Sequence, residues 1–226
     1  MSGVVRRKGV RERAAQATRD SLLRAAIRVF ARHGLHGGSV DKIAKAAGSY
    51  DRMIYYYFGS KEGLFVAVLE EIYRRFNEAE SKLELDFERP VESLGTVVRF
   101  VHEYYRKHPE FVTLLNSENL HRGRHIGKSL RAREYSSPAV GILERLLASG
   151  VARGLFRPGL TGRDLYLLVA STGSFYQSNR FTLSAFLGEN LEAPEAVAHW
   201  QSFVLDTVLR AVCADEPVCA AAARVA

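Results

Sequence analysis

Two short amphipathic segments joined by a glycine are the feature that most constrains the fold of this chain. The first, residues 39–47, places apolar residues at the i, i+3, i+4, i+7 spacing of one helix face, at Val40, Ile43, Ala44 and Ala47. Ser39 can cap this helix, Gly48 ends it, and a second short helix is expected over residues 51–57. Helices of about seven or eight residues are marginal in water, so both must pack on a third helix.

The preceding segment supplies that third helix. In "TRDSLLRAAIRVFARHG", residues 18–34, Leu23, Ile27 and Phe30 share one face, and Gly34 ends the run. A helix followed by two short helices with a glycine turn is the helix-turn-helix arrangement, whose second short helix enters the DNA major groove. The sequence therefore predicts a DNA-binding unit near its N-terminus.

Four aromatic residues stand in a row at positions 55–58 of the second short helix. Successive helical residues are turned about 100° apart, so the four rings cannot all face one core. Tyr57 is expected inward with Met53 or Ile54, and Phe58 is expected to continue the core. Tyr55 and Tyr56 then point outward, where a phenol can donate to phosphate while its ring packs on sugar or a thymine methyl.

The positive charge is concentrated in the same part of the chain. Of the net charge of +7, residues 1–76 carry +8, from 15 Lys and Arg against 7 Asp and Glu. A basic segment of this kind favours a polyanion partner, because neutralised phosphates release counterions. An N-terminal arm over residues 1–17 is either a solvated tail or a phosphate or minor-groove contact. Its basic residues, with the first one beyond it, are Arg6, Arg7, Lys8, Arg11, Arg13 and Arg19.

The rest of the sequence is also helical, and the predicted fold class is all-α because no stretch alternates convincingly with period two. Helix starts are expected at Ser60 as a cap, at Pro90 and Pro194 as first residues, at Ser137-Pro138, and at Thr161 with Asp164 as a capping box. There is no apolar run of transmembrane length and no apolar leader, so a cytoplasmic protein is expected. Cys213 and Cys219 are expected to be reduced thiols.

Residues 26–70 resemble the N-terminal DNA-binding domain of TetR/AcrR-type transcriptional regulators. The matching positions are Phe30, Gly34, Ile43-Ala44, Ala47-Gly48, Tyr55, Tyr57-Phe58, Ser60-Lys61-Glu62 and Leu64, and "GLFRPGL" at 154–160 resembles the turn before the family's penultimate helix. The resemblance implies a DNA-binding domain over 18–76, with its helix-turn-helix at about 39–58, and an effector-binding and dimerisation domain over 77–226. It implies a homodimer on a palindromic operator in double-stranded DNA, and repression relieved by a small molecule.

The sequence departs from the family pattern at the start of the recognition helix. Ser49 and Tyr50 stand where the family has an apolar residue and then a cap, so either Ser49 or Asp51 is expected to cap the helix. Arg52 can pair with guanine, while Asp51 can accept from cytosine or hold Arg52. Gly63 replaces a common acid and weakens the next helix start. The predicted DNA-binding residues are Ser39, Ser49, Tyr50, Asp51, Arg52, Met53, Tyr55, Tyr56 and Lys61.

The C-terminal domain yields candidates for a dimer face and an effector site. Apolar positions on the last two helices are interpreted as the dimer face, with intrachain core as the alternative: Leu165, Val169, Val197, Trp200, Val204 and Val208. Polar and aromatic residues on otherwise apolar helices are the effector candidates: Tyr104, Phe111, Asn116, Asn119, Tyr176, Asn179 and Arg180.

Other classes of function are less well supported. A helical small-molecule- or metal-binding protein, or an enzyme with no DNA role, is the alternative. A carboxylate-bridged di-metal bundle needs Glu-x-x-His twice, and Glu118-x-x-His121 occurs once. His125 could extend that pair, but Gly123 argues against one continuous helix. No metal or other cofactor and no enzymatic activity are therefore expected, and an architectural DNA-binding protein would not need the long C-terminal domain.

Overall fold

The computed structural model describes residues 2–214, with side chains described except at 2–11, 132–133 and 135–137. The described residues form nine α-helices and one 3-10 turn, η1 (Ile126–Lys128), which confirms the all-α prediction. Contacts within the chain divide it into two units. Unit 1 contains Met1–Tyr73 and Thr113–Ala132, and unit 2 contains Arg74–Val112 and Arg133–Ala226.

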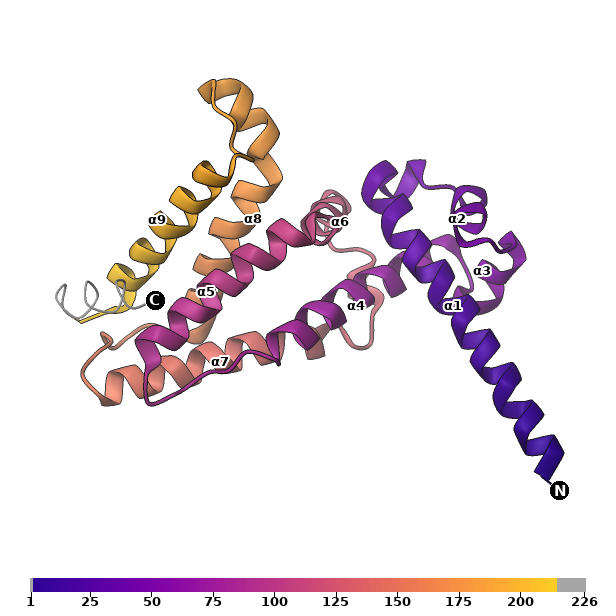
Figure 1. Ribbon diagram of the computed structural model, residues 1–226, viewed down its shortest axis with the longest axis horizontal. Coiled ribbons are helices and arrows are strands. Elements are labelled where there is room, and N and C mark those ends of the chain that lie inside the picture. Colours follow the sequence, from indigo (N-terminus) through magenta and orange to yellow (C-terminus); the bar gives the residue numbers. More distant parts are fainter. Residues whose placement is uncertain (1, 215–226) are drawn as a thin grey trace. The chain divides into compact units, whose positions relative to one another are not determined.

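Unit 1 is built around α1 (Ser2–Gly37), α2 (Val40–Ala47), α3 (Asp51–Phe58) and the first part of α4 (Lys61–Glu80). Figure 1 shows α2 and α3 packed on α1, the expected helix-turn-helix arrangement. Phe30 of α1 meets Phe65 of α4 edge-on at a centroid distance of 5.3 Å. The arm predicted ahead of the first helix lies within α1, and Gly34 (φ 67°, ψ 177°) interrupts that helix as expected.

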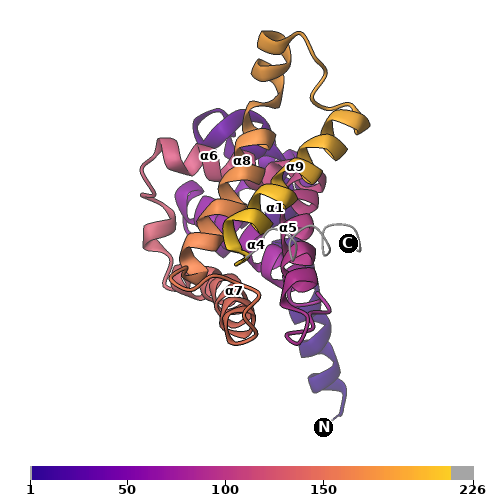
Figure 2. The same ribbon diagram turned by 90° about the vertical axis from the view of Figure 1, so that its left-hand side faces the viewer.

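Unit 2 contains the rest of α4, α5 (Pro90–Lys107), the start of α6 (Pro109–Leu120), α7 (Ala132–Ala152) from Arg133, α8 (Gly162–Leu187) and α9 (Pro194–Val212). Figures 1 and 2 both show α9 lying alongside α8 and α5, with which it is in contact. Phe76 and Phe111 stack at 5.4 Å within a cluster of aromatic rings that joins α4, α5 and α6. No helix among the described residues is both long and apolar enough to span a membrane.

Most predicted helix starts are confirmed. Pro90 and Pro194 are the first residues of α5 and α9. The Thr161 hydroxyl accepts from the Asp164 amide at 3.1 Å, and the Asp164 carboxylate accepts from the Thr161 amide, which completes the capping box of α8. The Ser60 hydroxyl accepts from the Gly63 amide at 2.9 Å at the start of α4.

The predicted start of α7 is wrong. The helix begins at Ala132, and Pro138 lies inside it rather than at its first position. A proline inside a helix removes one amide donor. Because Pro138 is exposed, water can satisfy the carbonyl that loses its partner.

The "GLFRPGL" turn is packed against the end of α9. Phe156 is buried and forms an isolated antiparallel bridge with Cys213, and the Arg157 amide donates to the Val212 carbonyl at 2.9 Å. A Cβ on Gly150 would lie 2.0 Å from the Phe156 ring, so only glycine fits there. Cys213 is buried, and Cys219 lies outside the described residues.

Candidate nucleic-acid interface

The turn between α2 and α3 is fixed by backbone hydrogen bonds at Gly48. Gly48 adopts a left-handed conformation (φ 62°), and the Ser49 amide donates to the Ala44 carbonyl at 2.9 Å. This pattern closes α2 and redirects the chain within two residues. The Ser21 hydroxyl of α1 donates to the Ala47 carbonyl at 3.2 Å, so the turn is also held to the longest helix of unit 1.

The recognition helix starts without a side-chain cap. Tyr50 is its N-cap residue, and no side chain accepts from the first amides of α3. Neither Ser49 nor Asp51, the two residues expected to cap, is the N-cap. The Tyr50 carbonyl accepts from the Met53 amide at 2.9 Å. The Asp51 and Arg52 amides at the start of α3 are therefore available to an external acceptor such as a phosphate oxygen.

The two faces of α3 differ sharply in exposure. Ile54 is fully buried, so it, rather than Met53, holds α3 to the unit, while Tyr57 and Phe58 are half-buried. Tyr55 and Tyr56 are 54% and 76% exposed, as predicted for outward-facing rings.

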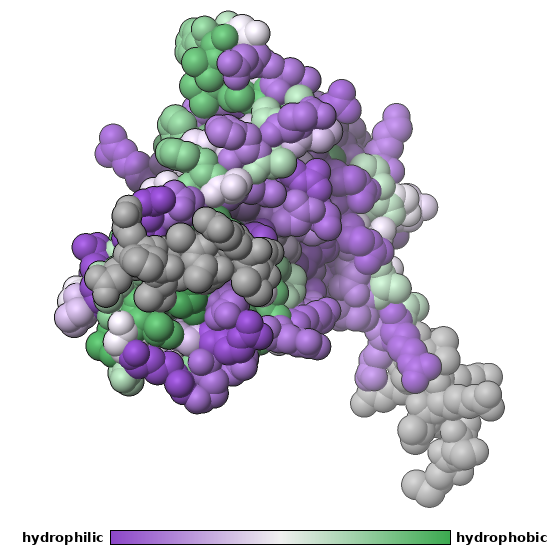
Figure 3. Space-filling view, turned by 60° about the vertical axis from the view of Figure 1, so that its left-hand side comes forward, coloured by the Kyte–Doolittle hydropathy of each residue, from purple (hydrophilic) through white to green (hydrophobic). Residues whose placement is uncertain are grey.

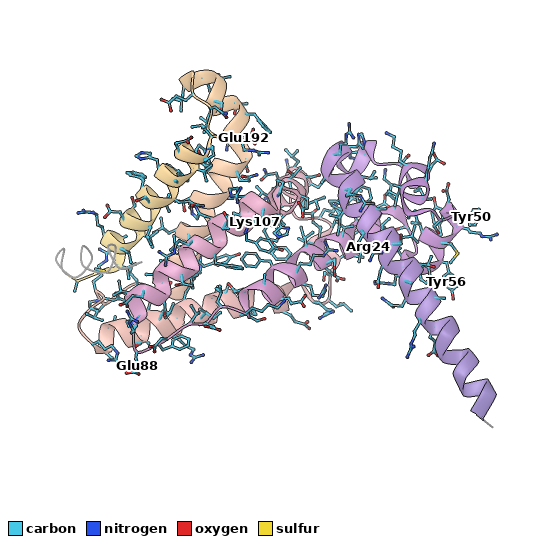
Figure 4. The ribbon with its side chains drawn as sticks, in the orientation of Figure 1. Arg24, Tyr50, Tyr56, Glu88, Lys107 and Glu192 are labelled. Atoms are coloured by element: carbon cyan, nitrogen blue, oxygen red, sulfur yellow. The ribbon has the colours of Figure 1, made fainter. Side chains whose placement is uncertain are left out.

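Tyr50 adds a third exposed aromatic side chain at the start of α3. Its ring is 70% exposed, and in Figure 4 Tyr50 and Tyr56 both point away from the helices on which α3 packs. The Arg52 guanidinium lies 5.2 Å from the centre of the Tyr50 ring, in cation–π range. Asp51 and Arg52 are exposed beside them. This surface, Tyr50, Asp51, Arg52, Tyr55 and Tyr56, is called the α3 face below.

Basic residues also gather at the end of α1. The Lys61 ammonium donates to the His36 carbonyl at 3.3 Å, and the Lys42 ammonium donates to the Gly37 carbonyl at 3.2 Å. A helix C-terminus attracts cations, so both lysines are positioned by α1 and keep donors for another acceptor. Ser39, predicted to touch DNA, accepts from the Lys42 amide as the cap of α2.

Two basic residues of α2 were missed by the sequence analysis. Lys42 and Lys45 are exposed on the second helix of the unit, within the helix-turn-helix. Their i, i+3 spacing opposite the buried Ile43–Ala44 pair was the available signal.

Glu118 and His125, two of the three residues considered as metal ligands, are hydrogen-bonded to each other. The Glu118 carboxylate accepts from the His125 and Ile126 amides at 2.6 and 2.9 Å and contacts His125 Nδ1 at 2.8 Å. These contacts occupy the carboxylate, and the part of the chain that the structure describes contains no group of three potential metal ligands. As Gly123 suggested, α6 ends at Leu120.

Unit 2 contains a ligand-sized cavity of about 500 Å³ between α5, α8 and α9. Tyr176 and Arg180, two of the effector candidates, line it, and Tyr176 stacks on Trp200 at 5.3 Å. Arg180 pairs with Glu192 at 3.0 Å. Burial lowers the pKa of His102, another lining residue, to about 4, so its ring is neutral at pH 7.

The other effector candidates lie elsewhere. Tyr104 and Phe111 are buried in the aromatic cluster of unit 2. Asn116 and Asn119 are exposed in unit 1, and Asn179 donates to the Phe175 carbonyl at 2.8 Å. These five aromatic and amide residues were chosen because they interrupt apolar stretches, a signal that does not distinguish packing from binding.

Four of the six predicted dimer-face residues are buried inside the chain, because the stripes that they form face its own core. These residues are Leu165, Val169, Val204 and Val208, while Val197 and Trp200 line the cavity. A different apolar set on α8 and α9 is at least half exposed: Leu167, Phe175, Phe181, Phe186, Leu187 and Phe203. In Figure 3 apolar side chains gather at the top of the view, over the C-terminal end of α8. Contiguous exposed apolar patches are uncommon on monomeric proteins.

Two protein-family models match the chain. Residues 22–68 match the model described as bacterial regulatory proteins, tetR family, and residues 90–208 match the tetracyclin repressor-like C-terminal domain. The first match contains the whole helix-turn-helix, and the second contains most of the described part of unit 2.

Named relatives match over most of their length. The HTH-type transcriptional repressor NicS of Pseudomonas putida is 49% identical over 205 residues, covering 91% of this chain and 97% of NicS. The HTH-type transcriptional regulator RutR of Escherichia coli is 29% identical over 173 residues, covering 75% of this chain and 79% of RutR.

Solved structures share the fold at lower identity. The fatty acid degradation regulator FadR of Bacillus halodurans superposes with a TM-score of 0.63 at 24% identity, covering 84% of this chain and 93% of that chain. A TetR family transcription regulator from Marinobacter aquaeolei VT8 superposes with a TM-score of 0.62 at 20% identity, covering 90% and 98%.

Proposed function

Because the chain belongs to the tetR family of bacterial regulatory proteins, we propose that it is a DNA-binding transcriptional repressor that leaves a palindromic operator when a small molecule binds. The observation that carries this proposal is the α3 face. It exposes three tyrosines beside an arginine on the second helix of a helix-turn-helix, where burial in the chain's own core cannot explain them.

The residues of the α3 face have distinct proposed roles. Arg52 contacts base edges, where its guanidinium can donate two hydrogen bonds to guanine. The Tyr50 ring, on which that guanidinium lies, orients the arginine side chain. Tyr55 and Tyr56 donate to phosphate oxygens. Lys61 supplies a cation beside the N-terminus of α4, and Ser39, Ser49, Asp51 and Met53 stay in the proposed interface.

Basic residues outside α3 add phosphate contacts that do not depend on sequence. We include Lys42 and Lys45 of α2, and the basic side chains of residues 1–17, of which those up to residue 11 lie outside the described side chains. The proposed DNA-binding domain covers residues 18–76 and is preceded by the arm at 1–17. Residues 77–226 form the proposed effector-binding and dimerisation domain.

The proposed assembly is a homodimer formed by α8 and α9. Six large apolar side chains on these helices are at least half exposed in the single chain, and a second copy would cover them. A two-fold dimer reads two half-sites separated by one or more helical turns of DNA. A small-molecule effector in unit 2 then favours a geometry that does not span both half-sites.

A regulatory rather than catalytic activity fits the comparisons, since the named relatives are transcriptional regulators. A cytoplasmic location follows from the proposed partner, double-stranded DNA.

Selection from random double-stranded DNA tests the proposal directly. The full chain is expected to enrich one palindromic sequence, and a compound screen on that complex should then find a molecule that releases it. If repeated rounds enrich no sequence, DNA recognition by this chain is disproved.

A further inference from the structure

Unit 2 contains a second, smaller cavity where four helices meet. Side chains of α4, α5, α7 and α8 enclose it, among them Phe76, Tyr105, Leu143 and Val169. Its volume is about 10 Å³, which is close to the minimum for one water molecule. The wall is almost entirely apolar or aromatic.

One carboxyl group faces this apolar wall. Glu80, the last residue of α4, lines the cavity and is only 3% exposed. Its Oε2 atom is buried and has no hydrogen-bond partner. Burial raises the pKa of Glu80 to about 7, and burial together with the Glu80 charge raises the pKa of Tyr166 across the cavity. A buried acid without a partner destabilises a fold, so packing alone does not account for it.

The larger cavity also has a buried polar atom without a partner, the Trp200 Nε1 donor, but no carboxylate in that state. Its lining carboxylates are paired, Glu192 with Arg180 at 3.0 Å and Glu103 with Arg106 at 2.7 Å. The Arg106 hydrogen bond lowers the pKa of Glu103 to about 2, which keeps that carboxylate ionised and satisfied. Among the described acids of unit 2, Glu80 is thus the one that an incoming donor would stabilise most.

We propose that Glu80 selects the effector, which is a small, mainly apolar molecule carrying an N–H or O–H donor that binds the Glu80 carboxyl in the cavity between α4, α5, α7 and α8. This inference rests on the proposed function, in which unit 2 receives an effector. A ring-sized molecule exceeds the present volume, so binding displaces aromatic side chains such as Phe76 and Tyr105. Phe76 and Glu80 are both on α4, the helix that begins at Lys61, three residues after the end of α3.

Four ring compounds of similar size test the donor requirement on the full chain: benzylamine, benzyl alcohol, toluene and benzoate. The dissociation constant of each is measured by calorimetric titration. At pH 8, where Glu80 is mostly ionised, benzylamine and benzyl alcohol are expected to bind about tenfold tighter than toluene, since a hydrogen bond to a charged group contributes at least that factor. At the same pH benzoate, which brings a second negative charge beside the Glu80 carboxylate, is expected to bind more weakly than toluene.

A proton count separates recognition by Glu80 from a merely structural effect. At pH 6 Glu80 is mostly protonated, so benzylamine binding should release about one proton, measured by titration in buffers of different ionisation heat. Benzyl alcohol should release none. If benzylamine binds more tightly than benzyl alcohol, the effector is cationic. If benzyl alcohol binds more tightly, the effector is neutral.

Two variants at Glu80 and one matched control complete the test. In Glu80→Met, and in Glu80→Gln if the first does not fold, the proton release should vanish. In Glu80→Met the donor preference should fall to near unity. Glu84, four residues further on, is exposed, so Glu84→Met should keep both the proton release and the preference for donors.

Several results would overturn the inference: no binding by any of the four compounds, donors that bind no tighter than toluene, or a preference that survives Glu80→Met. The operator selection on the wild-type chain without added compound is independent of all of them. A failure of the Glu80 site is thus distinguishable from a failure of DNA recognition.

Discussion

Tyr55, Tyr56 and Tyr57 are adjacent in the sequence but lie in different surroundings. Tyr57 is half-buried and its ring meets that of Tyr56 edge-on at 4.9 Å, while Tyr55 and Tyr56 remain exposed. The 100° rotation per helical residue explains this division, because only one side of an eight-residue helix can face α1 and α2. The exposed phenols keep their donors for a partner.

At the same scale, Arg52→Ala should relax the preference for particular bases in the selected operator, because a bidentate contact to guanine discriminates by about 1–3 kcal/mol per base pair. Quantitative sequencing of DNA bound by the variant measures this. Arg163→Ala, an exposed arginine of α8, is the control and should leave the preference unchanged. An unchanged preference in Arg52→Ala would show that α3 is placed wrongly on DNA.

Glu80 makes the stability of unit 2 depend on pH. Its pKa is about 7 in the folded chain against an ordinary 4.5, so the folded state holds the proton more tightly. The contribution of Glu80 to the free energy of unfolding is therefore most favourable below pH 4.5. It falls by about 3 kcal/mol in total as the pH rises through about 7.

Glu80→Gln should remove that decline. The difference in unfolding free energy between the variant and the wild type should grow between pH 4.5 and 7, as measured by urea unfolding at each pH. Glu84→Gln should show no such growth. A difference that stays constant over this range would mean that Glu80 titrates normally.

At the scale of helices, the close approach of α3 and α4 explains why residue 63 is a glycine, which the comparison with the family pattern did not show. A Cβ at this position would lie 2.1 Å from the Phe58 carbonyl oxygen, so glycine lets the end of α3 approach the start of α4 closely. What the sequence analysis interpreted as a weakened helix start is thus a requirement of the tight junction between these two helices.

Gly63→Ala should accordingly lower the thermal midpoint, by an amount that corresponds to roughly 1–3 kcal/mol, because backbone must shift to relieve the clash. Gly141→Ala in α7 has open space around the new methyl and should instead stabilise the helix by up to about 1 kcal/mol. Scanning calorimetry measures the thermal midpoint of both variants. Equal effects would contradict the tight junction.

Helix positions were largely predictable because caps, prolines and apolar spacing are local signals. Thr161 with Asp164, Pro90 and Pro194 marked their helices correctly, whereas Pro138 did not, since an exposed proline can be accommodated inside a helix. It was harder to predict what each apolar helix face packs against. Periodicity identified Val204 and Val208 as one stripe but could not say whether the chain itself or a second copy covers it.

The candidate sites depended on partners far apart in the sequence. Glu80 gave no sequence signal, because nothing local shows that four helices enclose its carboxyl. The exposed α3 face was predictable, since its residues are contiguous and only their rotation about one helix axis had to be worked out.

For the whole molecule, the exposed apolar residues of α8 and α9 predict assembly. Phe175→Glu with Phe203→Glu should convert a dimer to a monomer, because two charges per copy would be buried against each other in the interface. Sedimentation equilibrium measures the mass. Leu130→Glu, at an exposed leucine of unit 1, should leave the dimer intact. A wild-type monomer would refute this interface.

Salt dependence of binding to the selected operator tests the central claim of DNA recognition most directly. Phosphate contacts from Lys and Arg release counterions, so the logarithm of the association constant should fall linearly with the logarithm of salt concentration, with a slope of about −0.9 per phosphate neutralised. Lys61→Ala should reduce the slope by about one and weaken binding nearly equally on all sequences. An affinity that does not change with salt would contradict DNA binding by this chain.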